Sequence, residues 1–192
     1  AGLGERVVSR LRQAGHGVTL VRPGDTFAKM SDGSYVISPE RGREGYDLMV
    51  QDLVKAGTVP SRVLHLWLTT QDESHRPGSS FFHRNQERGF YSLLFLAQAI
   101  ADENLPRPLA LTVITSDAQR VAGEALPHPE KALTLGPALV TPRELSGVHV
   151  RTLDVRLPAV QKRLFGGKLA MALVDPFAGR KQVTAGLDAL AD

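Results

Sequence analysis

The sequence contains no cysteine, so it can form neither a disulfide bond nor a thiolate metal site. Its 23 basic and 20 acidic residues nearly balance, and the surplus of +3 is too small and too dispersed to indicate a nucleic-acid partner. No apolar run approaches the roughly 20 residues that cross a bilayer, and no signal-peptide pattern is found at the first residues. We therefore expect a cytoplasmic protein with no nucleic-acid or membrane partner.

The length and composition favour a single α/β domain. The chain has 192 residues, of which 42% are hydrophobic, and this is enough to bury a core. We expect residues 1–192 to form one subdomain. Within it, prolines and glycines interrupt the pattern over 155–182 and predict an irregular insertion or linker, with a strand or short helix over 169–174. Residues 183–192 predict a terminal helix leading to the next domain.

The central part of the chain alternates between helix and strand patterns. The predicted elements are, in order, a helix over 90–101, a strand over 109–115, a helix over 130–140 and a strand over 148–154. Pro106 and Pro108 end the first helix, and Pro129 occupies the first turn of the second, which Gly136-Pro137 kinks or ends. This alternation predicts a parallel sheet with right-handed crossovers. The expected core includes Leu93, Phe95, Val113, Ile114, Val150 and Leu153.

The N-terminal part continues the same pattern. Its predicted elements are a glycine-rich turn and helix over 1–15, strands over 18–21, 34–37 and 62–68, a helix over 46–55 and a polar loop over 69–80. Gly15 suits a left-handed helix cap. In a doubly wound sheet a strand precedes the first turn, and no such strand is present in the sequence. We expect either that the chain starts inside a larger polypeptide or that another segment fills the position.

Four segments in this order, FYSLLFLAQAI, TVITSDAQ, HPEKALTLGPALVTPREL and VHVRTLDV, closely resemble the structural (N-terminal) subdomain of ketoreductase regions in modular type I polyketide synthases. Pseudo-ketoreductases of these synthases contain similar segments. The resemblance covers about residues 1–155. It implies an α/β fold, namely a truncated, degenerate Rossmann-like domain related to short-chain reductases, with a mostly parallel sheet.

The resemblance also implies a function. Such a subdomain is non-catalytic and supports a downstream catalytic ketoreductase subdomain of the same polypeptide, or lies beside a methyltransferase. NADPH would bind the catalytic subdomain and not this chain, and an acyl carrier protein would be a further partner. A docking role predicts an exposed apolar patch of several hundred Å².

Two features are weak candidates for cofactor binding. Gly2 and Gly4 form half of a dinucleotide fingerprint, but Val7 stands where the third glycine belongs. Arg22 follows the second strand of the expected fold, where an arginine can hold the 2′-phosphate of NADP. An ordinary turn and a solvated arginine are the simpler explanations of these two features, so we expect no cofactor site in this chain.

The residues of reductase chemistry are incomplete. Ser116 lies at the strand end where short-chain reductases place a serine, but Pro129 occupies the tyrosine position thirteen residues later. Lys131 is close in sequence, yet no tyrosine precedes it by four residues. We therefore predict no catalytic residue, with Ser116 closing a turn or capping a helix.

Two alternatives remain open. In the first alternative to the structural role, the chain is an NADP-dependent ketoreductase in its own right that uses Arg22, Ser116 and Lys131. In the second, it is a recognition module for a carrier protein. A metal site at His75 and His83, near Asp72 and Glu73, matches no known ligand spacing, so none is predicted. His65 lies in an apolar strand and is predicted to be a core histidine.

Overall fold

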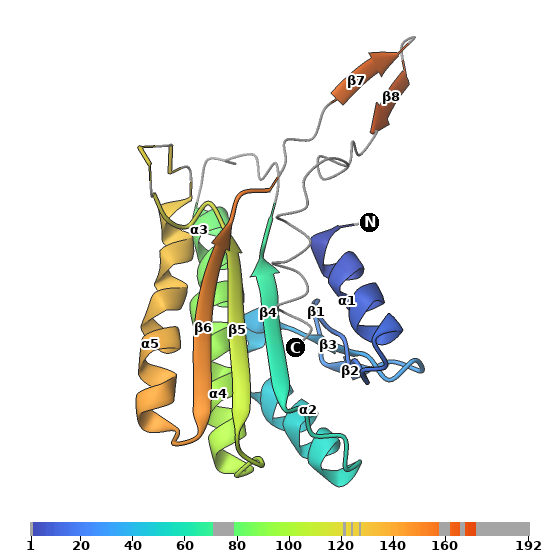
Figure 1. Cartoon of the computed structure of the whole chain (residues 1–192), viewed down its shortest axis with the longest axis vertical. Helices are drawn as coiled ribbons and strands as arrows, with labels where there is room; N and C mark the ends of the chain where they lie inside the picture. The colour runs from blue at the N-terminus through green and yellow to red at the C-terminus, as the bar shows by residue number, and fades with distance from the viewer. Residues whose placement is uncertain are drawn as a thin grey trace. The chain divides into compact units, whose positions relative to one another are not determined.

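The computed structural model describes residues 2–70, 79–120, 122–123, 125–126, 128–157, 162–165 and 168–171 (Figure 1). Its contacts divide the chain into two compact units. The larger unit spans Thr19–Thr70 and Ser74–Arg156, and the smaller unit comprises the remaining residues. Among the described helices, none is both long and apolar enough to span a membrane. The predicted helix over 183–192 lies outside the described residues, and the prediction of one subdomain stays a prediction.

A three-stranded parallel sheet forms the centre of the larger unit. Strands β4 (Arg62–Leu68), β5 (Leu109–Ser116) and β6 (Val148–Val155) lie in that order. The ladders place Val63, Leu111 and Val150 side by side. Each strand matches the range that its apolar run predicts to within a residue, because β-branched and apolar side chains favour a pleated, covered surface.

Helices α2 (Glu44–Lys55), α4 (Ser92–Asp102) and α5 (Leu135–Glu144) provide the apolar side chains that cover one face of this sheet. Leu93 of α4 and Ala138 of α5 pack on Leu111 and Val113 of β5. Burying an aliphatic side chain of this size contributes about 1.5 to 3 kcal/mol. Figure 1 shows α4 and α5 running alongside β5 and β6.

The sheet face explains one wrong core prediction. Leu93, Val113 and Ile114 are buried, but Leu153 is 41% exposed. Leu153 is three residues after Val150 on β6, so its side chain lies on the opposite face of the sheet, away from the helices. Among the described residues, β6 also has a strand partner on only one side. An edge position on the uncovered face leaves the leucine open to solvent.

Two predicted helices differ from the observed ones. The helix expected over 90–101 is the last part of a longer segment, in which α3 (Ser79–Gln86) continues through a π-helical turn (Glu87–Tyr91) into α4. The helix expected over 130–140 begins as a 3₁₀ turn, η3 (Pro129–Thr134), and extends as α5 beyond the expected end. The helix changes from 3₁₀ to α geometry just before Gly136-Pro137, the pair at which the sequence predicts a kink or an end.

A second, smaller sheet belongs to the same unit. Strand β3 (Tyr35–Ile37) pairs in parallel with β1 (Val21–Pro23) and in antiparallel with β2 (Ala28–Lys29). The predicted strand over 18–21 was wrong in its bounds, since β1 begins at Val21 and its first hydrogen bond to β3 is made by Leu20, whose carbonyl accepts the N–H of Tyr35. The two-residue strand β2 has no alternating pattern of its own and was not predicted.

The smaller unit contains the first helix and a hairpin. Helix α1 (Leu3–Gln13) is followed by Gly15 at φ +87°, the left-handed cap that the sequence predicts. Strands β7 (Lys162–Phe165) and β8 (Lys168–Met171) form an antiparallel pair. This pair lies in the region expected to be irregular, and β8 favours the strand alternative over 169–174.

Candidate functional site at the strand ends

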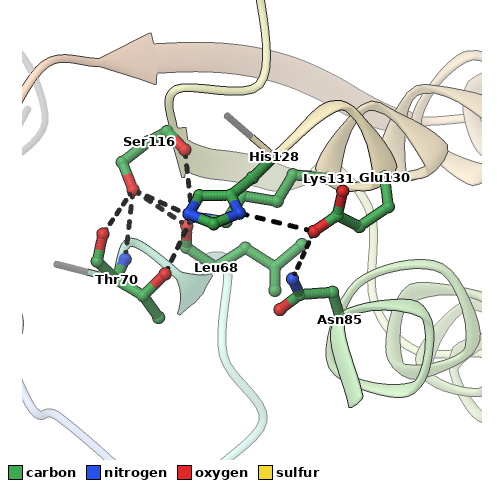
Figure 2. Close-up of polar contacts among 7 residues, drawn as sticks. All are labelled: Leu68, Thr70, Asn85, Ser116, His128, Glu130 and Lys131. Carbon is green, nitrogen blue, oxygen red and sulfur yellow. Dashed lines mark hydrogen bonds and ion pairs between the residues drawn. The ribbon is translucent and has the colours of Figure 1, made fainter. Parts of the chain in front are cut away.

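The carboxyl ends of β4 and β5 meet the first turn of η3 in a buried polar cluster (Figure 2). Both Ser116, the last residue of β5, and Lys131 in η3 have no exposed surface. Lys131 Nζ lies 2.8 Å from Thr70 Oγ1, 3.1 Å from Ser116 O and 3.3 Å from Ser116 Oγ. An ammonium group has three N–H donors, and here three oxygens accept them. Thr70, Ser116 and Lys131 are called the strand-end cluster below.

The hydroxyl of Ser116 is saturated with hydrogen bonds. Its oxygen accepts the N–H of Thr70 at 3.1 Å as well as the ammonium of Lys131. Its single proton faces the carbonyl oxygens of Thr70 at 2.9 Å and Leu68 at 3.3 Å. A hydroxyl offers one donor and two acceptor lone pairs, so the fold uses all three.

A second set of contacts fixes the start of η3. Asn85 of α3 donates from Nδ2 to Glu130 Oε1 at 2.9 Å, and His128 Nδ1 lies 3.6 Å from the same oxygen. The ring of Phe81 lies 5.2 Å from that of His128. Figure 2 shows Asn85, His128 and Glu130 beside the strand-end cluster. Glu130 thereby anchors the turn that directs Lys131 inward.

Asp154 of β6 holds the loop that leaves β5. Its carboxylate accepts hydrogen bonds from Thr115 Oγ1 at 2.7 Å, from Ala118 N at 3.1 Å and from Gln119 N at 3.0 Å. The neighbouring Asp117 has φ +57°, which permits the sharp turn. In doubly wound folds ligands bind outside the carboxyl ends of the strands. Here the protein's own side chains bond to one another across three of those ends.

The structure brings together two of the three residues suspected for a reductase. Ser116 and Lys131 are in contact, and Ser116 joins two strand ends rather than capping a helix. Arg22 instead extends from β1 to Ser34 Oγ, at 3.5 Å. Ser34 in turn bonds to Asp32, which lowers the pKa of that carboxyl group, and Arg22 lowers it further. A carboxylate beside Arg22 opposes the approach of a phosphate.

None of the chain's three tyrosines is a member of the strand-end cluster. The hydroxyl of Tyr35 donates to Asp52, while the rings of Tyr46 and Tyr91 pack against Phe95. Burial raises the pKa of Tyr46 above its ordinary value. The proton donor that short-chain reductases require next to the serine and the lysine is therefore not a tyrosine here.

In the smaller unit, the glycine pair begins α1 without a phosphate cradle. Gly2 is the N-cap, and its N–H donates to Glu5 Oε2 at 3.3 Å. Gly4 lies inside the first turn, and Val7 is buried at the third glycine position. A carboxylate already bound at the helix start competes with any pyrophosphate. Glu5 and Val7 thus occupy positions that the glycine fingerprint leaves open for a dinucleotide.

The histidines form no metal site within the described part of the chain. His75, Asp72 and Glu73 lie outside the described residues, so that hypothesis is not tested. His65 is buried in β4 with Nε2 2.7 Å from Ser92 Oγ, and burial lowers its pKa to about 4. The prediction of a core histidine is confirmed.

Sequence reasoning missed four residues that hold the site, namely Thr70, Asn85, Glu130 and Asp154. Two of them had a usable signal, since Thr70 is the second residue after β4 and Asp154 is near the end of β6, where polar side chains belong to the ligand edge of such sheets. Asn85 and Glu130 gave none, because their contact joins α3 to η3 across 45 residues of sequence.

Comparison with known proteins identifies a family and a fold. The family model described as beta-ketoacyl synthase-like, N-terminal, matches residues 3–128, which is well over half of the chain. One similar structure is a multidomain module of a keto acid-selecting NRPS with adenylation, ketoreductase and pseudo Asub domains, at 22% identity and TM-score 0.73 over 100% of this chain. Another is an N-terminal ketoreductase from the macrolactin assembly line, at 15% identity and TM-score 0.62 over 81% of this chain.

A third similar structure, a short-chain dehydrogenase/reductase from Serratia marcescens BCRC 10948, has 16% identity and TM-score 0.56 over 80% of this chain and 73% of its own. The chain spans only 14% of the NRPS module and 30% of the macrolactin ketoreductase. No curated protein sequence matches it. At these identities the likeness shows the fold, and it confirms the predicted Rossmann-like α/β domain with a mostly parallel sheet.

Proposed function

Because the chain belongs to the beta-ketoacyl synthase-like, N-terminal family, we propose that it is a non-catalytic structural subdomain of a polyketide synthase ketoreductase region. In this role it supports an NADPH-dependent catalytic subdomain of the same polypeptide. It performs no turnover itself and binds no dinucleotide. The similar structures are a module with several domains and an assembly-line ketoreductase, and both support a multidomain setting.

One observation carries this proposal, namely the saturated strand-end cluster. A catalytic serine needs a proton to give to a substrate carbonyl, or a lone pair to receive one. The Ser116 hydroxyl already faces Leu68 and Thr70, and the Lys131 ammonium has three oxygen partners inside the protein. The residues that would run the chemistry hold the strand ends together instead.

The exposed apolar side chains suit a docking role. Leu133, Leu139 and Val140 on η3 and α5 are 38%, 60% and 49% exposed, and Phe82 of α3 shares an open surface depression with Leu133. Apolar surface of this kind marks interaction sites. We propose the catalytic subdomain, or a methyltransferase of the same polypeptide, as the partner. The predicted patch area and an acyl carrier protein partner stay predictions.

The test compares this chain alone with this chain joined to its catalytic subdomain. NADPH fluorescence titration is expected to show no saturable binding to the chain alone and saturable binding to the joined form. The chain should also raise the melting temperature of the catalytic subdomain when the two are mixed. Saturable micromolar NADPH binding by these 192 residues alone would contradict the proposal.

A reductase in its own right is the second candidate, and the 3.3 Å contact between Ser116 Oγ and Lys131 Nζ is what favours it. The deciding assay is reduction of a model ketone by the chain alone with NADPH. Under the structural proposal the rate equals the background rate. A rate that the chain raises, and that Lys131→Met abolishes while the protein remains folded by circular dichroism, would establish this candidate.

A further inference from the structure

An open depression on the larger unit is formed by side chains of α3 and η3, and we call it the Glu130 depression. Its lining consists of one charged residue, Glu130, and four apolar residues, namely Phe82, Pro129, Ala132 and Leu133. Its volume of about 480 Å³ far exceeds the roughly 30 Å³ that one water molecule occupies in the liquid. Phe82 is 46% exposed and Leu133 is 38% exposed, so both offer apolar surface to an incoming group.

The carboxylate of Glu130 is largely removed from solvent, since its side chain is only 11% exposed. Asn85 donates from Nδ2 to Oε1 at 2.9 Å, and His128 Nδ1 lies 3.6 Å from the same oxygen. Figure 2 shows both contacts ending on that one oxygen. Among the described residues no contact reaches the second oxygen, Oε2, which is therefore available to a group that enters the depression.

A carboxylate in such a position normally has a positively charged partner. Within the described part of the chain, no lysine or arginine forms an ion pair with Glu130. Lys131, its neighbour in sequence, directs its ammonium to Thr70 and the end of β5. Arg84 of α3 instead lies over the ring of Phe81, with Cζ 5.9 Å from the ring centroid. The depression thus combines apolar walls with a negative charge that no neighbouring cation compensates.

We propose that the Glu130 depression binds an arginine side chain of the catalytic subdomain. This inference rests on the proposed function, which supplies that partner. An arginine fits both features, because its methylene stem packs on apolar surface while its guanidinium presents N–H donors in a rigid fork. One donor would bond to Glu130 Oε2, and the guanidinium plane would stack on the exposed ring of Phe82.

The same chemistry disfavours other occupants. An acidic side chain would be repelled by Glu130. A purely apolar side chain would take Oε2 out of water without giving it a partner, which is unfavourable for a carboxylate. A lysine could donate to Oε2 but has no plane to stack on Phe82. We therefore expect a preference for arginine over lysine, and for lysine over a neutral side chain.

Three capped tripeptides probe this preference on the unmodified chain. Each has glycine on both sides of a central residue, which is arginine, lysine or citrulline, the last being a neutral analogue of arginine with the same shape. NMR titration should show saturable shifts of the amides of Phe82, Ala132 and Leu133 with the arginine peptide, smaller shifts with lysine and none with citrulline. The amide of Val36 in β3 is the unchanged reference. Equal shifts with arginine and citrulline, or none with any peptide at millimolar concentration, would overturn the inference.

Glu130→Gln removes the charge and keeps an oxygen that can accept the N–H of Asn85, so η3 should keep its anchor. Both the arginine peptide and the catalytic subdomain should bind roughly 3- to 10-fold more weakly, because a neutral hydrogen bond replaces a charge-assisted one. The matched control is Glu144→Gln at the exposed end of α5, which should change binding less than about 2-fold. Equal weakening by the two variants would contradict a specific role for Glu130.

Phe82→Leu tests the stacking part of the inference separately. The variant keeps an apolar wall but removes the ring, so the preference for the arginine peptide over the lysine peptide should shrink. A preference that stays unchanged in the folded variant would show that the guanidinium does not stack on Phe82.

Calorimetry with the catalytic subdomain separates this inference from the proposed function. If the subdomain binds the unmodified chain and Glu130→Gln equally well, the arginine inference fails and the proposed function stands. If it binds neither, the proposed function fails, and the peptide titration alone decides whether the depression recognises a guanidinium. Self-association of the chain that Glu130→Gln abolishes would assign the arginine to a second copy and would overturn the inference.

Discussion

Two basic side chains are buried against the same sheet, and each lies next to a serine hydroxyl, but their surroundings differ. His65, in the middle of strand β4, meets Ser92 of α4 at 2.7 Å. Lys131 of η3 meets Ser116 at the carboxyl end of β5, at 3.3 Å, and contacts two further oxygens. Among the described contacts, the histidine has one hydrogen-bonding partner atom and the lysine has at least three.

The histidine is buried as an uncharged ring. Ser92 Oγ donates to Arg88 O at 2.7 Å, so it accepts the proton on Nε2 of His65. Nδ1 of His65 has no hydrogen-bond partner among the described residues. Burial lowers the pKa of His65 to about 4, because an apolar environment disfavours the charged form. At neutral pH a single hydrogen bond is enough.

The lysine shows what a buried ammonium requires. Each of its three donors has an oxygen, and all three oxygens belong to the ends of β4 and β5. Such charge-assisted bonds are about twice as strong as neutral ones. The comparison therefore teaches that the strand-end cluster uses the hydrogen bonds of one lysine to hold two strands together, at the edge where a related enzyme would bind its ligand.

Removing the lysine should have the largest effect. Lys131→Met removes the hydrogen bonds to three buried oxygens, each of which costs about 1 to 3 kcal/mol when left unpaired, so the expected loss is about 3 to 9 kcal/mol. Urea unfolding of the variant and of the unmodified protein measures this difference in the free energy of unfolding.

The matched control for this variant is Lys29→Met, since Lys29 is 49% exposed beside Asp52 and its loss should leave the stability nearly unchanged. Unchanged or higher stability of Lys131→Met would show that the ammonium is retained for something other than the fold.

The second largest effect is expected on lowering the pH, which protonates His65. The pKa of His65 is about 4 in the folded protein and about 6.5 when unfolded, so the unfolded chain binds the proton first. Stability is full above pH 6.5 and falls between pH 6.5 and 4, by up to about 3 kcal/mol. Urea midpoints across this range measure the slope.

His65→Gln keeps a donor toward Ser92 and removes the titration, so its slope over this range should be flatter. Asp32 and Asp52, whose pKa values are lowered below 3.8, lose their contributions only at lower pH. An equal slope in His65→Gln would assign the acid sensitivity to other groups.

The strands were predictable from sequence, because a buried strand records its environment in a continuous apolar run. The run over 62–68 matches β4, and the run over 109–115 lacks only Ser116 of β5. Pairing is not recorded in this way. Strand β2 has two residues, and its pairing depends on a turn in which Gly33 N–H donates to Met30 O.

The candidate site was predictable only as a set of residue types. Ser116 and Lys131 could be named from their spacing, but their contact depends on η3 beginning as a 3₁₀ turn anchored by Glu130. The hydrogen bond from the Trp67 indole to Val21 O gave no signal either, because it joins positions 46 residues apart. Polar contacts between residues distant in sequence depend on the fold, so they can be identified only once the structure is known.

The two serines give the finest test of the comparison. Ser116→Ala removes a donor to the carbonyls of β4 and an acceptor for both Thr70 and Lys131, and it should cost about 2 to 3 kcal/mol. Ser92→Ala removes the single acceptor of His65 and a local bond in the helix, and it should cost about 1 to 2 kcal/mol. Urea unfolding of the two variants should therefore differ by about 1 kcal/mol, with Ser116→Ala the less stable. Equal stability would mean that Ser116 contributes no more to the fold than an ordinary buried serine, and the case for a purely structural role at the strand ends would lose its basis.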